Sequence, residues 1–102
     1  MFEKLLIANR GDSACRIART GHRMGIALAT VHSAVDRQAA HVREIGHSIE
    51  VGGGPAQLSY LNIPAIIEAA RAVGAEAVHP GIGFLSESSD FAAAVEGAGM
   101  IF

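Results

Sequence analysis

A chain of 102 residues, half of them hydrophobic, has the length of one domain and enough apolar side chains for a single core. Its formal net charge of −2 supplies no basic field, which excludes nucleic acid and anionic membranes as expected partners. Its single cysteine, Cys15, excludes an internal disulfide and is typical of a reducing compartment.

A strand and a helix are predicted at the start of the chain. Residues 4–9, KLLIAN, are a short aliphatic segment typical of a strand. After Gly11, small and apolar residues recur at the spacing of one helix face, at positions 14, 17, 18, 21 and 24. Asp12 or Ser13 can cap the first N–H groups of this helix, and Gly25 can end it.

A second strand, IALATVHS, is expected over residues 26–33. Asp36 is then placed to cap a short helix that extends to Ile45, and a weaker third strand follows over residues 47–51. The glycines of GGGP, residues 52–55, predict a loop, because glycine loses the most backbone entropy when it is ordered.

The second half of the chain contains the clearest helix. Asn62 is a good N-cap, and apolar side chains then share one helix face, at positions 63, 66, 67, 70 and 73. A fourth strand, AEAVH, is expected over residues 75–79, and Ser88 or Ser89 can cap a last helix. Residues 100–102 have the composition of a fifth strand at its start, which favours a fragment of a longer chain.

Strands that alternate with helices indicate parallel βαβ units with right-handed crossovers. We therefore expect an α/β fold, an open, mostly parallel Rossmann-like sheet with flanking helices, in a single domain over residues 1–102. No apolar run reaches the ~18 residues of a membrane span. The N-terminal segment MFEKLLIANRG has the pattern of neither a signal peptide nor a transit peptide, so a cytoplasmic location is expected.

Motifs for cofactors and catalysis are missing from the sequence. The first strand-to-helix turn, ANRGDSA, lacks the three glycines of a dinucleotide site, and Asp12 would repel a phosphate. The five histidines show no metal-binding spacing, and no G-x-S-x-G nucleophile elbow occurs. We therefore expect no bound cofactor or metal and no catalytic residue in this chain. His79 is the histidine of most interest, because it ends a strand where α/β folds build their sites.

Three arginines, Arg16, Arg19 and Arg23, lie three and four residues apart and share one face of the first helix. Two interpretations stay open: a solvated face, or a subunit contact in which guanidinium groups pair with carboxylates. Asp12 is placed to pair with Arg16 one helical turn later.

The segment VHPGIGFLSE, residues 78–87, predicts a loop that presents one side chain. Gly81 and Gly83 flank Ile82, and glycines allow the backbone to turn sharply. We expect Ile82 to line a cleft at the carboxyl edge of the sheet, with Phe84 anchoring the loop. Burial of Ile82 in the core is the alternative.

Longer segments resemble one family. KLLIANRG, CRIART, SYLNIPAIIEAARAVGAEAVHPG and GFLSE are together similar to the N-terminal, pre-ATP-grasp domain of biotin carboxylase, and the similarity extends over essentially the whole chain. This family is the ATP-dependent component of acetyl-CoA, propionyl-CoA and pyruvate carboxylases. The resemblance implies a parent enzyme that uses ATP, magnesium and bicarbonate to carboxylate biotin.

The resemblance also implies that this chain supplies one wall of a cleft and part of a subunit contact. In the family, the phosphate-binding lysines, the metal carboxylates and the bicarbonate-binding residues come after the matched segment, so the isolated chain is expected to be inactive. Its partners would be the remaining ATP-grasp domains, the biotin carboxyl carrier and the carboxyltransferase. The implied residues on the biotin side of the cleft are His79, Gly81, Ile82, Gly83 and Glu87.

The sequence departs from the family pattern at several positions, including one in the expected site. Ile82 stands where the family typically has a tyrosine, whose ring and hydroxyl resemble a wall for the biotin ring. Arg23 replaces an acidic contact residue of some members, whereas Arg19 keeps its match. Further departures are Asp12, Ser13 and Leu58. These changes indicate a divergent paralogue, and the alternative function is a free-standing interaction module that docks through the arginine face.

Overall fold

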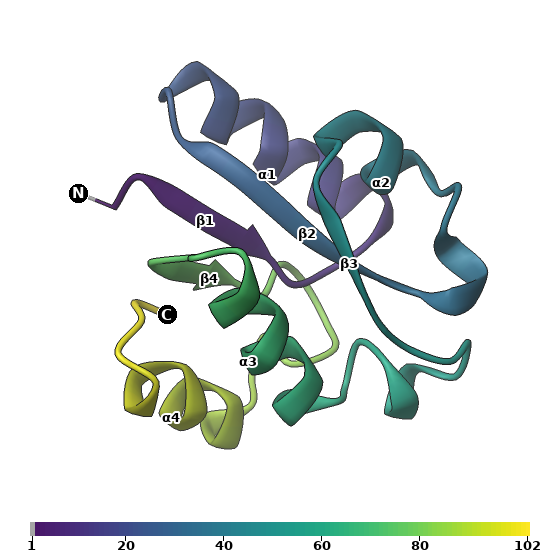
Figure 1. Ribbon diagram of the computed structural model, residues 1–102, viewed down its shortest axis with the longest axis vertical. Coiled ribbons are helices and arrows are strands. Elements are labelled where there is room, and N and C mark those ends of the chain that lie inside the picture. Colours follow the sequence, from purple (N-terminus) through teal and green to yellow (C-terminus); the bar gives the residue numbers. More distant parts are fainter. Residues whose placement is uncertain (1) are drawn as a thin grey trace.

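The computed structural model describes residues 2–102 as one parallel sheet between two helical layers (Figure 1). The sheet has the strand order β3-β2-β1-β4, and every neighbouring pair is parallel. The strands are β1 (Lys4–Ile7), β2 (Ala27–Ser33), β3 (Ser48–Gly52) and β4 (Ala77–His79). The predicted α/β fold is therefore confirmed, with the first strand of the chain at an inner position.

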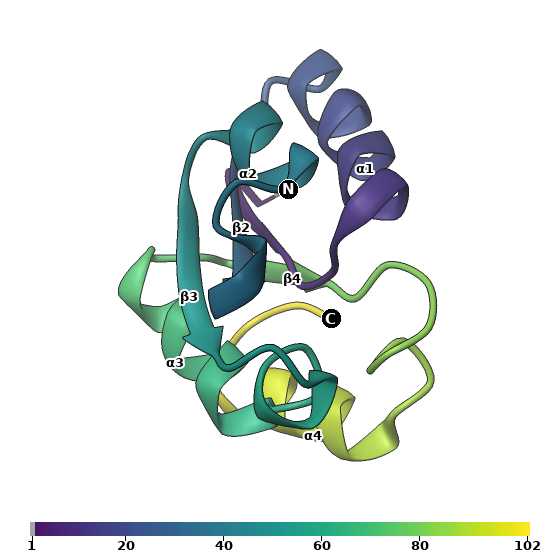
Figure 2. The same cartoon turned by 90° about the vertical axis from the view of Figure 1, so that its right-hand side faces the viewer.

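Two helices cover each face of the sheet, as Figure 2 shows. Helices α1 (Gly11–Arg23) and α2 (Ala40–Ile45) lie on one face. Helices α3 (Ile63–Ala72) and α4 (Ser89–Gly97) lie on the other. Within the described residues, none of these helices is long and apolar enough to cross a membrane.

The inner strand β1 contributes to the core on both faces. Leu5 and Ile7 pack with Ala18 of α1, whereas Leu6 packs with Phe91 of α4. Successive side chains of a strand point to opposite faces, and both faces are covered here. The continuous apolar run of β1 is the composition that a parallel strand buried on both faces requires.

A fifth strand position lies at the free edge of β4. Ile101 forms an isolated parallel bridge with Ala77. The backbone N–H of Val78 donates to the Ile101 carbonyl at 2.8 Å, and the Ile101 N–H donates to the Glu76 carbonyl at 2.9 Å. Residues 100–102 were expected to begin a fifth strand, and Ile101 takes its first place beside β4.

Two of the predicted helix caps are confirmed and two are wrong. Asn62 and Ser88 accept hydrogen bonds from backbone N–H groups in the first turns of α3 and α4. Helix α1 begins at Gly11, so Asp12 lies inside its first turn, and its N-cap residue Arg10 makes no side-chain cap. Asp36 does not cap α2, because the helix begins only at Ala40, with Ala39 at its N-cap. The Asp36 carboxylate is bound by side chains from two other connections, as described next.

Candidate functional site

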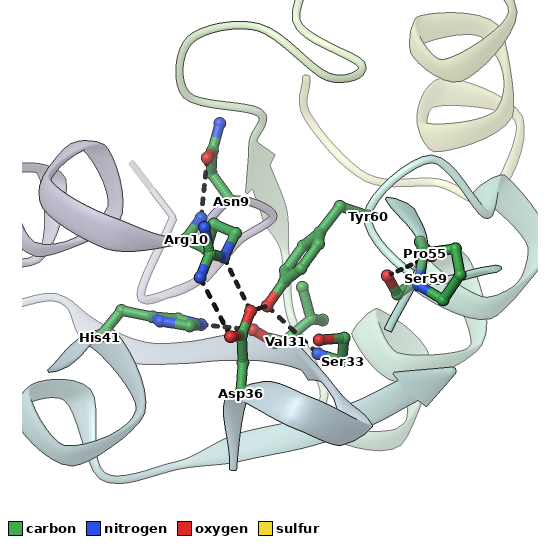
Figure 3. A network of polar contacts seen from close by, with 9 residues as sticks. All are labelled: Asn9, Arg10, Val31, Ser33, Asp36, His41, Pro55, Ser59 and Tyr60. Atoms are coloured by element: carbon green, nitrogen blue, oxygen red, sulfur yellow. Dashed lines mark hydrogen bonds and ion pairs between the residues drawn. The ribbon is translucent and has the colours of Figure 1, made fainter. Parts of the chain in front are cut away.

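A chain of polar contacts joins the connections that follow β1, β2 and β3 (Figure 3). The Arg10 guanidinium donates twice to Asp36, from Nε to Oδ2 at 2.7 Å and from Nη2 to Oδ1 at 3.0 Å. The Tyr60 hydroxyl donates to Asp36 Oδ2 at 2.7 Å and accepts a hydrogen bond from the Ser33 N–H at 3.1 Å. We call these residues, Arg10, Ser33, Asp36 and Tyr60, the edge network.

The electrostatics of the edge network favour one protonation state. The hydrogen bond from Arg10 lowers the pKa of Asp36, although partial burial opposes this shift. Burial, followed by the contact with Asp36, raises the pKa of Tyr60. Asp36 is therefore ionised and Tyr60 protonated at neutral pH, and neither group is poised for general acid–base catalysis. The network holds the three connections in place.

The loop after β4 presents Ile82 to solvent. The Ile82 residue is 81% exposed, which rules out burial in the core. Gly81 and Gly83 both have a φ of 71°, in the left-handed region that glycine adopts without strain. Phe84 stacks on Tyr60 with ring centroids 5.2 Å apart, so this end of the loop rests on the edge network.

A groove of about 390 Å³ lies between α1 and the β1–β4 part of the sheet, and we call it the α1 groove. Four predicted site residues line it: Arg16, His79, Gly81 and Ile82. Most of the remaining lining is apolar and includes Phe2, Leu5, Ile17, Met24 and Ile26. Gly83 and Glu87, the other predicted site residues, lie outside this lining, and Glu87 is exposed.

The arginines of α1 have different surroundings, although all three are exposed. Arg19 donates from Nε to Oε1 of Glu44 in α2 at 3.1 Å. Arg16 lines the α1 groove, and Arg23 is in the last turn of the helix. Among residues 2–102, the expected pair between Asp12 and Arg16 is not formed.

His79 supports the turn into the Ile82 loop. Its Nδ1 accepts a hydrogen bond from the Gly81 N–H at 3.0 Å, which requires an unprotonated Nδ1. Desolvation lowers the pKa of His79, although the residue keeps an exposed side. The hydrogen bond and the desolvation both favour a neutral His79 ring, which binds the backbone of its own loop.

A serine–histidine contact that the sequence did not predict joins β2 and β3. Ser48 Oγ lies 2.6 Å from Nδ1 of His32. Glu50 Oε1 is 3.7 Å from His32 Nε2, beyond hydrogen-bond distance, and Arg37 binds the same carboxylate at 2.6 Å. A catalytic triad needs a third group that hydrogen-bonds and orients the base, so we interpret this contact as part of strand pairing.

Two further residues bear on the expected chemistry. His41 is fully buried, and its Nε2 donates to the Val31 carbonyl at 2.9 Å. Cys15 is buried in α1, and burial raises the pKa of its thiol, the reverse of what activates a nucleophile. In the part of the chain that the structure describes, no three His, Cys, Asp or Glu side chains form a group able to hold a metal ion.

Comparison with known proteins gives a consistent result. Residues 1–102 match the family model described as biotin carboxylase, N-terminal domain. The chain is 52% identical over 102 residues to the biotin carboxylase of Haemophilus influenzae and covers 23% of that protein. It is 50% identical over 102 residues to the propionyl-CoA carboxylase alpha chain of Ruegeria pomeroyi and covers 15% of it. In both cases the match covers 100% of this chain.

A solved structure has the same fold. The biotin carboxylase domain dimer of Hydrogenobacter thermophilus 2-oxoglutarate carboxylase, in complex with MgADP, ADP and bicarbonate, superposes with a TM-score of 0.92 at 40% identity. The match covers 98% of this chain and 22% of that one. The chain thus spans less than a quarter of each of these relatives. The full-length match to the domain model places this chain in the biotin carboxylase N-terminal domain family.

Proposed function

We propose that this chain is the first domain of a biotin carboxylase subunit, which uses ATP and bicarbonate to carboxylate biotin. The observation that carries the proposal is the match of residues 1–102 to the N-terminal domain family. The exposed Ile82 loop at the carboxyl edge of the sheet supports it, since open α/β sheets bind ligands at this edge.

In this proposal the nucleotide and its magnesium ion are held by the rest of the subunit, which has the ATP-grasp fold. The Hydrogenobacter thermophilus domain that binds MgADP and bicarbonate is more than four times as long as the segment matched here. Asp36, a carboxylate at the carboxyl edge of the sheet, is already bound by Arg10 and Tyr60. It is therefore not free to ligate a cation, and the isolated chain is expected to be inactive.

The biotin side of the cleft is proposed to be the Ile82 loop. Ile82 supplies an apolar contact for the ring of biotin, and Gly81 and Gly83 give the loop its shape. His79 accepts a hydrogen bond from the Gly81 N–H and so stabilises the turn. The exposed Glu87 lies at the far end of the loop. Isoleucine lacks the hydroxyl and the flat ring of a tyrosine, so biotin is expected to bind more weakly than it does beside a tyrosine.

The α1 groove and the arginine face are proposed as surfaces that the remaining subunit covers. Met24, which is 53% exposed, and Ile82, which is 81% exposed, both line the groove, and apolar surface gathered in one place is typical of an interaction site. Arg16 and Arg23 present cations suited to carboxylates of a neighbouring domain or subunit. The biotin carboxyl carrier and the carboxyltransferase complete the proposed assembly, and the lone buried Cys15 supports the cytoplasmic location.

A chimera tests the proposal. Residues 1–102 would replace the matched segment of the Haemophilus influenzae biotin carboxylase, with circular dichroism to check folding. We expect bicarbonate-dependent ATP hydrolysis that free biotin stimulates. A folded chimera that binds ATP but does not respond to biotin would contradict the proposal and favour the free-standing interaction module.

The 102-residue chain alone supplies a second test. We expect it neither to hydrolyse ATP in the presence of bicarbonate nor to bind ATP tighter than millimolar, because phosphoryl transfer needs clustered metal, lysine and arginine groups. Micromolar ATP binding in a calorimetric titration would overturn this division of roles.

A further inference from the structure

The side chain of Asn9 bridges two loops that are far apart in the sequence. Asn9 follows β1 and is 2% exposed. Its Nδ2 donates to the Pro80 carbonyl and to the Ile82 carbonyl, both at 2.8 Å. Its Oδ1 accepts a hydrogen bond from the Arg10 N–H at 2.7 Å (Figure 3). Both amide hydrogens and the amide oxygen are therefore occupied.

The residue between the two bound carbonyls has to be glycine. A Cβ on Gly81 would lie 2.5 Å from Nδ2 of Asn9, closer than real Cβ contacts come. The φ of Gly81, 71°, is also one that residues with a side chain rarely adopt. The loop thus crosses the Asn9 amide at a distance that only glycine permits, with a hydrogen bond on each side.

Ile82 depends on this contact for its position. The residue is 81% exposed, so contacts of its own side chain hold it very little. The loop is held at three nearby points: the Ile82 carbonyl, bound by Asn9, the Gly81 N–H, bound by His79, and the Phe84 ring, stacked on Tyr60. Of these, the Asn9 contact acts on residue 82 itself, whereas the other two act on neighbouring residues of the loop.

We propose that Asn9 is a positioning residue for the substrate cleft: it fixes the backbone of residue 82 without contacting substrate. The inference rests on the proposed function, in which side chain 82 faces biotin. Loss of the two donated hydrogen bonds would let the loop move and would weaken biotin binding. The nucleotide, which is held elsewhere in the subunit, would be unaffected.

The substitution Asn9→Asp removes the two donated hydrogen bonds without changing the size of the side chain. Aspartate has the size of asparagine and keeps an acceptor for the Arg10 N–H, but it places an oxygen against two carbonyl oxygens. The chain has one other asparagine, Asn62, which caps α3 by accepting from the Ala65 N–H. Asn62→Asp keeps that acceptor and is the matched control.

In the chimera described above, Asn9→Asp is expected to raise the KM for biotin about fivefold or more, as loss of a positioning hydrogen bond implies. The KM for ATP and the kcat at saturating biotin should stay within about twofold, the range expected for a change that removes only substrate binding. Asn62→Asp should leave all three values unchanged. An unchanged KM for biotin, or an equal rise in the KM for biotin and the KM for ATP, would overturn the inference.

If Asn9→Asp fails to fold, Gly81→Ala tests the same contact from the loop side, because its new methyl group displaces the Asn9 amide. It too should raise the KM for biotin selectively. A folded Gly81→Ala chimera with an unchanged KM for biotin would count against the role of the contact.

A spectroscopic readout on the 102-residue chain does not depend on activity. The side-chain NH₂ of Asn9, donated to two carbonyls, should exchange with water much more slowly than the NH₂ of Asn62, whose single contact to the Leu58 carbonyl is 3.3 Å long. Equal exchange rates would refute the contact itself. Slow exchange in the chain together with a chimera that ignores biotin would instead refute the proposed function.

Discussion

Deletion of one hydroxyl in the edge network should have a large effect on stability. Tyr60→Phe removes the donor to Asp36 Oδ2 and the acceptor for the Ser33 N–H, and Tyr60 is only 2% exposed. A hydrogen bond to a charged group contributes about 1.5–3 kcal/mol, and a buried N–H left without a partner costs about 1–3 kcal/mol. Since Arg10 still binds Asp36, we expect a combined loss of about 2–4 kcal/mol in the free energy of unfolding.

Urea denaturation at pH 7 measures this loss. Each 1 kcal/mol corresponds to about 4–8 °C in the Tm of a domain of this size, so thermal unfolding supplies an independent check. Ser89→Ala, which deletes an exposed hydroxyl in the first turn of α4, is the control and should change stability by less than about 0.5 kcal/mol.

A double-mutant cycle with Asp36→Asn identifies the contact responsible. If the Tyr60 hydroxyl acts through Asp36, the two changes together should differ from the sum of the single changes by about 0.5–3 kcal/mol. A loss below about 0.5 kcal/mol for Tyr60→Phe, or strict additivity in the cycle, would refute this account of the network.

Two further predictions concern the loop and the pH dependence. In the chimera, Ile82→Tyr should lower the KM for biotin about threefold to tenfold, the value of one uncharged hydrogen bond, with no change in ATP affinity. Because Ile82 is 81% exposed, the variant should fold normally, and an unfolded variant would mean that the side chain points inward. Burial lowers the pKa of His41 in the folded chain. Below about pH 6.5, His41 is therefore protonated in the unfolded chain but stays neutral in the folded chain. Stability should therefore fall as the pH drops from 7 to 5, less steeply in His41→Gln; equal slopes would exclude His41 as the cause.

The features that were predicted correctly from the sequence are local ones. The caps Asn62 and Ser88 act within three residues of their own positions, and the strands are short aliphatic runs that a two-sided parallel sheet requires. The turn that exposes Ile82 was also predictable, because two flanking glycines allow one backbone conformation that other residues disfavour.

The features that were missed depend on distant partners. Asp36 was expected to cap a helix, but α2 begins only at Ala40, and the Asp36 carboxylate binds Arg10 and Tyr60, 26 and 24 residues away. Asn9 binds carbonyls more than 70 residues later, which no local pattern encodes. The burial of His41 likewise depends on another element, because its Nε2 donates to the Val31 carbonyl of β2.

The inner position of β1 has a consequence for the order in which the chain folds during synthesis. β1 is made first, and β2 can pair with it as soon as Ser33 has emerged. Its other neighbour, β4, ends roughly 46 residues later, which corresponds to about 2–9 s of translation at ~5–20 residues per second. For that interval one side of this apolar strand is an unpaired edge, an arrangement prone to aggregation in a nascent chain.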